Sequence, residues 1–292
     1  MGRMNSTVGS GSGVTVRRLL LGSQLRRLRE AQGVSREDAG YEIRASESKI
    51  GRMELGRVSF KERDVADLLT LYGVSDPGQR GELLGMVRIA NAVPWWHDYA
   101  DVVPAWFQSY LGFEEAAGCI ASYEVQFVPG LLQTEEYARA VIRLGSQHAP
   151  ESEIERRVEV RMRRQQLLTG EQAPRLAMVI DEAALRRPCG GPEVMRGQLL
   201  HLLELAERPG IELQVMPLGT AGLRAESGTF SLLGFREPDL ADVVYLEQFT
   251  TALYLDRPRE VAEYRDTLGR LREDSLSPGS SRELLSMLLQ EH

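Results

Sequence analysis

The sequence contains two cysteines, two lysines and no long apolar run, and these shortages exclude several classes of protein. Cys119 and Cys189 lie far apart, with no Cys-x-x-Cys pair and no Cys/His cluster, which argues against a disulfide scaffold and a zinc site. No stretch approaches the roughly 18–20 apolar residues that cross a bilayer, and no signal-peptide core is visible. We therefore expect a cytoplasmic protein without a membrane partner.

The length and composition indicate an ordinary soluble protein with two domains. At 292 residues the chain exceeds the roughly 100–200 residues of one domain, and 42% hydrophobic with 26% charged residues is typical of globular proteins. Only Lys49 and Lys61 of the 35 basic residues are lysines, which suggests a GC-rich coding sequence more than a specific chemistry. The formal net charge is −7, which by itself points away from nucleic acid.

Four segments differ in pattern. Residues 1–16 predict a flexible tail, because their first part is rich in Gly and Ser. Residues 17–92 predict an all-α domain of about five short helices, and residues 93–112 an aromatic-rich junction. Residues 113–292 predict an α+β domain with a mixed sheet, with strands near 119–128, 175–181, 211–218, 230–235, 242–247 and 252–256 and a last helix from about residue 258.

The stretch SREDAGYEIRASESKIGRMELG, residues 35–56, predicts two short helices joined by a tight turn. Ser35 and Ser46 stand where each helix would need a cap for its free backbone amides. Ala39 and Gly40 are small enough to let another helix approach closely, and Ile50 would face inward. This is the arrangement of a helix-turn-helix, with a polar outer face where DNA bases would lie.

The residues from Leu21 to Leu71 resemble the Cro/repressor (XRE) family of helix-turn-helix proteins. The pattern positions are occupied by Gly33, Val34, Ser35, Arg36, Gly40, Ile50, Glu54 and Gly56. The resemblance implies that Arg36 contacts phosphate, and that Arg29 and Glu54 form a partly buried ion pair. It also implies that Glu47, Ser48, Lys49 and Arg52 face base edges. Together with Arg36 and with Arg57, which follows directly after this segment, they are the predicted DNA-binding residues.

Two features of this segment keep alternatives open. Arg44 occupies the turn position that is usually glycine, and a positive φ there costs about 1 kcal/mol or more, which predicts a slightly remodelled turn. Glu47 could accept from cytosine, repel phosphate or favour the helix N-terminus. The competing interpretation of the whole segment is a small helical bundle whose charges are only solvated.

The charge distribution removes the objection raised by the acidic total. Residues 17–57 hold ten basic and six acidic side chains, a net +4, so the rest of the chain carries −11. Basic charge is therefore concentrated where phosphate contacts would need it, and the acidic remainder should limit non-specific adhesion.

Motifs of catalysis are missing. The chain has no phosphate-binding glycine loop, Gly-x-Ser-x-Gly or His-Glu-x-x-His, and none of its four histidines begins the His-x-Lys of phospholipase-D-like domains. His201 is better explained as a helix residue, and Asp181 with Glu182 as a helix cap, than as site residues. Residues 154–166 could be a second nucleic-acid surface, although an amphipathic helix with ion pairs explains them. We expect no enzyme, metal or cofactor.

From Trp95 onward the chain resembles the large C-terminal domain of uncharacterised function that follows an XRE domain in many actinobacterial regulators. The segments that carry the resemblance include YEVQFVPGLLQTEEYARAVI, DEAALRRPCGGPEVMRGQLLHLLELAE and GTFSLLGF. It implies a regulator and a small partner protein encoded in an adjacent gene.

Aromatic residues gather between the two expected domains. Trp95, Trp96, Trp106 and Tyr110 would fill a core or an interdomain contact, or alternatively form a ligand or partner surface.

Together these observations predict a sequence-specific transcriptional regulator that binds double-stranded operator DNA. One helix-turn-helix makes few base contacts, so we expect a homodimer on an inverted repeat. The α+β domain would dimerise or sense a ligand or small protein partner. The alternative is a toxin-antitoxin-like module, in which the C-terminal domain is an effector and the helix-turn-helix autoregulates its operon.

Overall fold

The computed structural model describes residues 14–170, 172–220, 228–236 and 240–291. Of the tail expected at residues 1–16, the first thirteen lie outside this range. The last three belong to the first helix, which begins at Val14 and already buries Val16. The β-branched residues at 14–16 are weak helix formers, so the sequence pattern placed the start too late.

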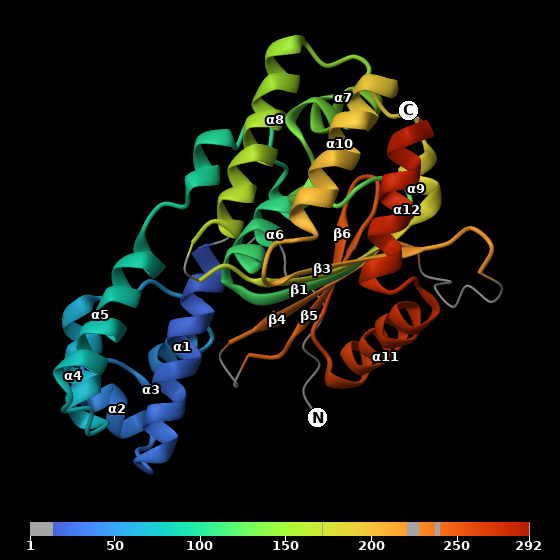
Figure 1. Ribbon diagram of the computed structural model, residues 1–292. Coiled ribbons are helices and arrows are strands. Elements are labelled where there is room, and N and C mark those ends of the chain that lie inside the picture. Colours follow the sequence, from blue (N-terminus) through green and yellow to red (C-terminus); the bar gives the residue numbers. More distant parts are fainter. Residues whose placement is uncertain (1–13, 171, 221–227, 237–239, 292) are drawn as a thin grey trace. The chain divides into compact units, whose positions relative to one another are not determined.

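The chain divides into two compact units (Figure 1), and the first is entirely helical. It takes in residues 14–100 and 104–116, together with residues 236 and 240. Its helices are α1 (Val14–Ala31), α2 (Arg36–Glu42), α3 (Glu47–Glu54), α4 (Glu62–Leu71), α5 (Pro77–Asn91), the 3₁₀ turn η1 (Trp95–Tyr99) and α6 (Ala105–Ala116). The expected aromatic junction at 93–112 is thus built into this unit as η1 and most of α6.

The core of the first unit forms where the apolar faces of α1 to α5 meet. Leu21 and Leu25 of α1 pack with Ile50 of α3 and with Leu68 and Leu69 of α4, all of them at most 2% exposed. Ile50 and Met53 of α3 are buried in this core, so the polar residues on the opposite face of α3 point outward.

The second unit is an α+β fold around one six-stranded mixed sheet. The strands are β1 (Ala117–Glu124), β2 (Arg175–Asp181), β3 (Ile211–Met216), β4 (Phe230–Phe235), β5 (Val243–Glu247) and β6 (Ala252–Leu255), in the order β3-β2-β1-β4-β5-β6. β1, β2 and β3 run parallel, whereas β4, β5 and β6 continue the sheet in antiparallel pairs. β1 ends four residues before the expected strand does, because the chain turns at residues 125–127 towards Pro129.

Helices cover both faces of this sheet (Figure 1). They are η2 (Gly130–Leu132), α7 (Glu135–Gly145), α8 (Glu151–Arg164), η3 (Gln165–Leu168), α9 (Glu182–Arg186), α10 (Pro192–Leu205), α11 (Pro258–Asp274) and α12 (Pro278–Glu291). α11 lies on one side, where Val261, Leu268 and Leu271 pack against Tyr123 and Phe230. α8 and α10 lie on the other side. The single closing helix expected after residue 258 is two helices, separated at Ser275–Ser277.

At the outer edge of β3, Val215 is hydrogen-bonded to α12 and to the segment that joins α11 to α12. Val215 donates its backbone N–H to Ser281 Oγ (2.9 Å) and accepts from the Leu276 N–H (3.0 Å). Because both backbone groups of Val215 are occupied, α12 and the preceding segment cover part of the parallel edge of the sheet.

Candidate nucleic-acid interface

The α2–turn–α3 segment forms because each helix has its own serine cap. Ser35 Oγ accepts from the Asp38 N–H (3.0 Å), and Ser46 Oγ accepts from the Lys49 N–H (3.2 Å). Both predicted caps are confirmed. Asp38 lies in the first turn of α2 and Glu47 in the first turn of α3, where a negative charge interacts favourably with the positive N-terminal end of the helix dipole.

Small residues allow the close approaches that this arrangement needs. A Cβ atom on Gly40 would come within 2.7 Å of the Ala45 carbonyl oxygen. The backbone does approach Gly40 closely, as expected, but the nearest segment is the turn before α3 and not another helix. Gly22 of α1 was not singled out in the sequence. A Cβ atom there would lie 2.4 Å from the Met53 carbonyl oxygen, so Gly22 lets α1 contact the backbone of α3.

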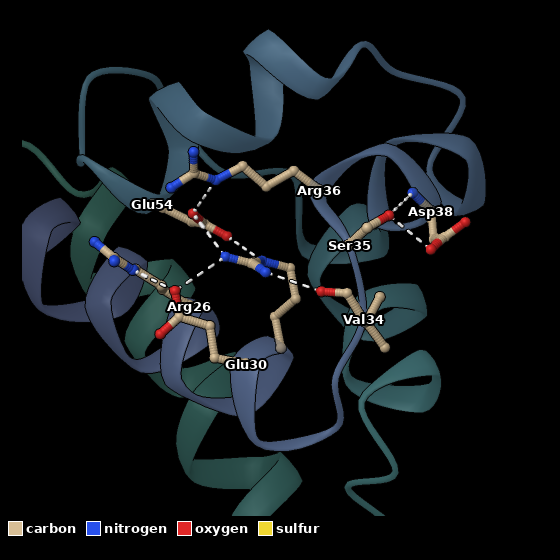
Figure 2. Close-up of polar contacts among 8 residues, drawn as sticks. Arg26, Glu30, Val34, Ser35, Arg36, Asp38 and Glu54 are labelled. Carbon is tan, nitrogen blue, oxygen red and sulfur yellow. Dashed lines mark hydrogen bonds and ion pairs between the residues drawn. The ribbon is translucent and has the colours of Figure 1, made fainter.

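A buried carboxylate ties three elements together (Figure 2). Glu54 lies at the end of α3, and its Oε1 accepts from Arg29 Nε of α1 (2.6 Å). Its Oε2 accepts from Arg36 Nε of α2 (2.9 Å). Arg29 also donates through Nη1 to the Val34 carbonyl (2.9 Å). The predicted Arg29–Glu54 pair is confirmed, and its hydrogen bond to Glu54 raises the pKa of Arg29 above the usual value.

The structure divides the six predicted DNA-binding residues into two sets. Glu47, Ser48, Arg52 and Arg57 are exposed on α3 and just beyond it, with no side-chain hydrogen bond or ion pair among the described residues. Two others are paired within the protein: Arg36 with Glu54, and Lys49 Nζ with Asp64 Oδ2 of α4 (2.9 Å). The Arg36 and Lys49 pairs were not expected, because both partners come from other helices.

The turn itself keeps the left-handed backbone that the pattern implied. Arg44 has a φ of 54°, so a non-glycine residue holds the left-handed position of the turn. The Arg44 N–H donates to the Tyr41 carbonyl (3.1 Å), and the Ala45 N–H donates to the Gly40 carbonyl (2.8 Å). These two bonds close the turn and hold Arg44 in this conformation.

The four aromatic residues proposed as a ligand or partner surface are mostly occupied in packing. Trp96 is 0% and Tyr110 6% exposed, which corrects the surface interpretation for these two in favour of the packing one. Trp95 and Trp106 are half-buried. The Arg17 guanidinium lies 5.8 Å from the Trp96 ring centre, and Arg17 also forms an ion pair with Glu115 (2.6 Å). Arg17 of α1 thus contacts η1 through Trp96 and α6 through Glu115.

Three further features concern metal sites, membrane-spanning helices and the Asp181–Glu182 pair. The described residues contain no group of three or more His, Cys, Asp and Glu side chains placed to hold a metal ion. Within the same residues, no helix is long and apolar enough to cross a membrane. Asp181 Oδ1 accepts from the Ala183 N–H (2.9 Å). Asp181 therefore caps α9, which is the role that the sequence favoured over a site role.

Comparison with known families agrees with this geometry. Residues 20–83, which include α2 and α3, match a helix-turn-helix domain, and such a domain implies DNA binding. No curated protein and no solved structure is significantly similar to the chain. Residues 107–287 match the family described as a domain of unknown function (DUF5753). This match covers more than half of the chain, and the protein therefore belongs to the DUF5753 family, with a helix-turn-helix domain at its N-terminal side.

Proposed function

We propose that the protein is a sequence-specific transcriptional regulator of the XRE type, which reads operator DNA with α3. The observation that carries this proposal is the exposed face of α3, where Glu47, Ser48 and Arg52 have no partner among the described residues. α3 is held by a cap, a core and a buried ion pair, so its outward side chains are presented on a rigid element. A rigid helix with a polar face is what base recognition in the major groove requires.

The second unit has a regulatory role in this proposal. We assign to it dimerisation and the response to a ligand or to a small protein encoded in the adjacent gene, and no catalytic step. A homodimer would present two copies of α3 to an inverted repeat, as single helix-turn-helix domains commonly require. A regulator of this kind acts where bacterial DNA lies, in the cytoplasm.

The experiment is a fluorescence-anisotropy titration of the full chain against its own upstream DNA and against an unrelated duplex, over a salt series. Arg52→Ala is expected to relax selectivity at one base pair, at a cost of about 1–3 kcal/mol in discrimination. The matched control is Arg88→Ala on α5, which removes an exposed arginine that pairs with Glu62. Equal operator selectivity in the parent and in Arg52→Ala would reject α3 as the reading helix.

A further inference from the structure

Arg44 is an exception among the left-handed residues of the protein. Of the described residues with positive φ, it is the only one that is not glycine. The other such positions in the first unit are Gly33, Gly56 and Gly73. Glycine adopts this backbone without a Cβ penalty, whereas arginine does not, so the chain uses the less favourable residue at this one turn.

The turn requires the left-handed backbone, and nothing described inside the protein explains the arginine. Two backbone hydrogen bonds close the turn around Arg44, and two residues later Ser46 caps α3. The Arg44 side chain is exposed. Among the described residues it has no carboxylate within ion-pair distance, although Glu42 and Glu47 are exposed nearby in the sequence. A glycine would build the same turn at lower conformational cost, so the advantage of the guanidinium must lie outside the isolated chain.

The position of the turn indicates the chemistry of what it meets. Arg44 precedes the N-terminus of α3, the end of a recognition helix that approaches base edges in helix-turn-helix proteins. The phosphates that border the groove lie beside such a helix end, and the positive end of the helix adds to the attraction. Arg36 and Lys49 already have carboxylate partners, so Arg44, Arg52 and Arg57 are the basic side chains of residues 35–57 without one among the described residues.

We propose that Arg44 is a phosphate-binding residue, whose guanidinium binds the DNA backbone at the edge of the groove entered by α3. This inference rests on the proposed function and adds a contact that positions the protein without reading sequence. Arg44 thus lowers the stability of the free protein through its strained backbone, and it raises the affinity of the protein for any duplex DNA through its charge.

Three variants test these two effects in the full chain. Arg44→Gly removes both the charge and the backbone strain, Arg44→Asn removes the charge with a residue that tolerates positive φ, and Arg44→Lys keeps both. Anisotropy titrations with operator and unrelated duplexes measure affinity and its salt dependence. Thermal unfolding, followed by tryptophan fluorescence, measures stability of the first unit, which holds Trp95, Trp96 and Trp106.

We expect Arg44→Gly to raise the melting temperature, yet to weaken binding to both duplexes about three- to tenfold at low salt. The slope of log K against log salt should fall by about 0.9 in Arg44→Gly and Arg44→Asn, and stay unchanged in Arg44→Lys. Unchanged affinity and slope in the two neutral variants would overturn the inference, and so would a loss confined to the operator. If the parent binds no duplex at all, the proposed function fails and this inference fails with it.

Discussion

Glu54 is the residue on which the geometry of α3 most depends. Its side chain is 3% exposed, and both of its oxygens accept from arginines that belong to other helices. Removing one partner of a buried pair leaves a charge without compensation, which costs far more than losing an exposed pair. The two arginines differ in this respect, because Arg29 is buried with Glu54 whereas Arg36 is 40% exposed.

Arg29→Met should therefore lower the free energy of unfolding of the first unit by about 3 kcal/mol. Arg26→Met is the control, since Arg26 forms an exposed pair with Glu30 one turn away, and its loss should be below about 0.5 kcal/mol. Urea denaturation followed by tryptophan fluorescence measures both. Similar losses in the two variants would show that burial of the Glu54 pair does not matter to stability.

Glu124, at the end of β1, is the residue that should make the second unit sensitive to pH. Burial, and then the nearby Glu247 carboxylate, raise the pKa of Glu124 to about 8, against the opposing effects of Arg161, Thr229 and Arg164. The folded state thus favours the neutral acid. This contribution to stability is complete below the ordinary pKa of 4.5 and is lost as the pH rises through the folded value of about 8.

We expect the parent to lose on the order of 5 kcal/mol of stability from this residue between pH 4.5 and 8. Glu124→Gln should remove that loss, so the variant should match the parent at about pH 4 and exceed it at about pH 8.5. Urea denaturation followed by circular dichroism at the two pH values is the measurement. A variant that differs from the parent by the same amount at both would contradict the assignment.

At the scale of elements, the packing of α2 and α3 depends on how closely their backbones approach neighbouring segments. Gly40 contacts the turn in which Arg44 lies, whereas a Cβ atom added at Gly51 would meet nothing within 4 Å. The two glycines thus occupy neighbouring short helices, α2 and α3, in opposite surroundings. Only one of them is required by packing.

Gly40→Ala should destabilise the first unit by about 1–3 kcal/mol, because the backbone of the turn must shift. Gly51→Ala should stabilise the unit by about 0.5–1 kcal/mol, since alanine favours helix and meets no obstacle. Urea midpoints from tryptophan fluorescence compare the two variants. Changes of the same sign in both would refute the close approach at Gly40.

At the scale of the whole molecule, charge is distributed unevenly along the chain. Residues 17–57, which hold most of α1 together with α2 and α3, carry a net +4, although the whole chain has a formal charge of −7. An acidic remainder weakens attachment to arbitrary DNA, so specific contacts must supply more of the affinity. A second reading helix from another copy of the chain is the simplest source of such contacts.

We expect a stoichiometric titration of operator DNA to end at two chains per duplex, with light scattering giving the mass of a dimer on one site. A duplex that carries a single half-site should bind far more weakly, because only one α3 can then reach bases. An end point of one chain per duplex, with full affinity for the half-site, would exclude the dimeric mode.

The sequence by itself determined the helix-turn-helix and the strands of the second unit, because both are encoded locally. The caps at Ser35 and Ser46, the small Gly40 and the inward Ile50 act within a few residues of one another. The apolar pattern likewise located all six strands, although β1 is shorter than expected and the closing helix is divided. The Arg29–Glu54 pair was reached through family resemblance and not through local pattern.

Only the tertiary structure decided which of the basic residues near α3 have a carboxylate partner within the protein. Arg36 and Lys49 are held by Glu54 and Asp64, which lie 18 and 15 residues away in sequence and approach only when the helices pack. The same packing buries Trp96 and brings Gly22 against α3. Sequence periodicity tells which face of a helix is polar, but the partner that a long charged side chain meets depends on how separate helices are placed in space.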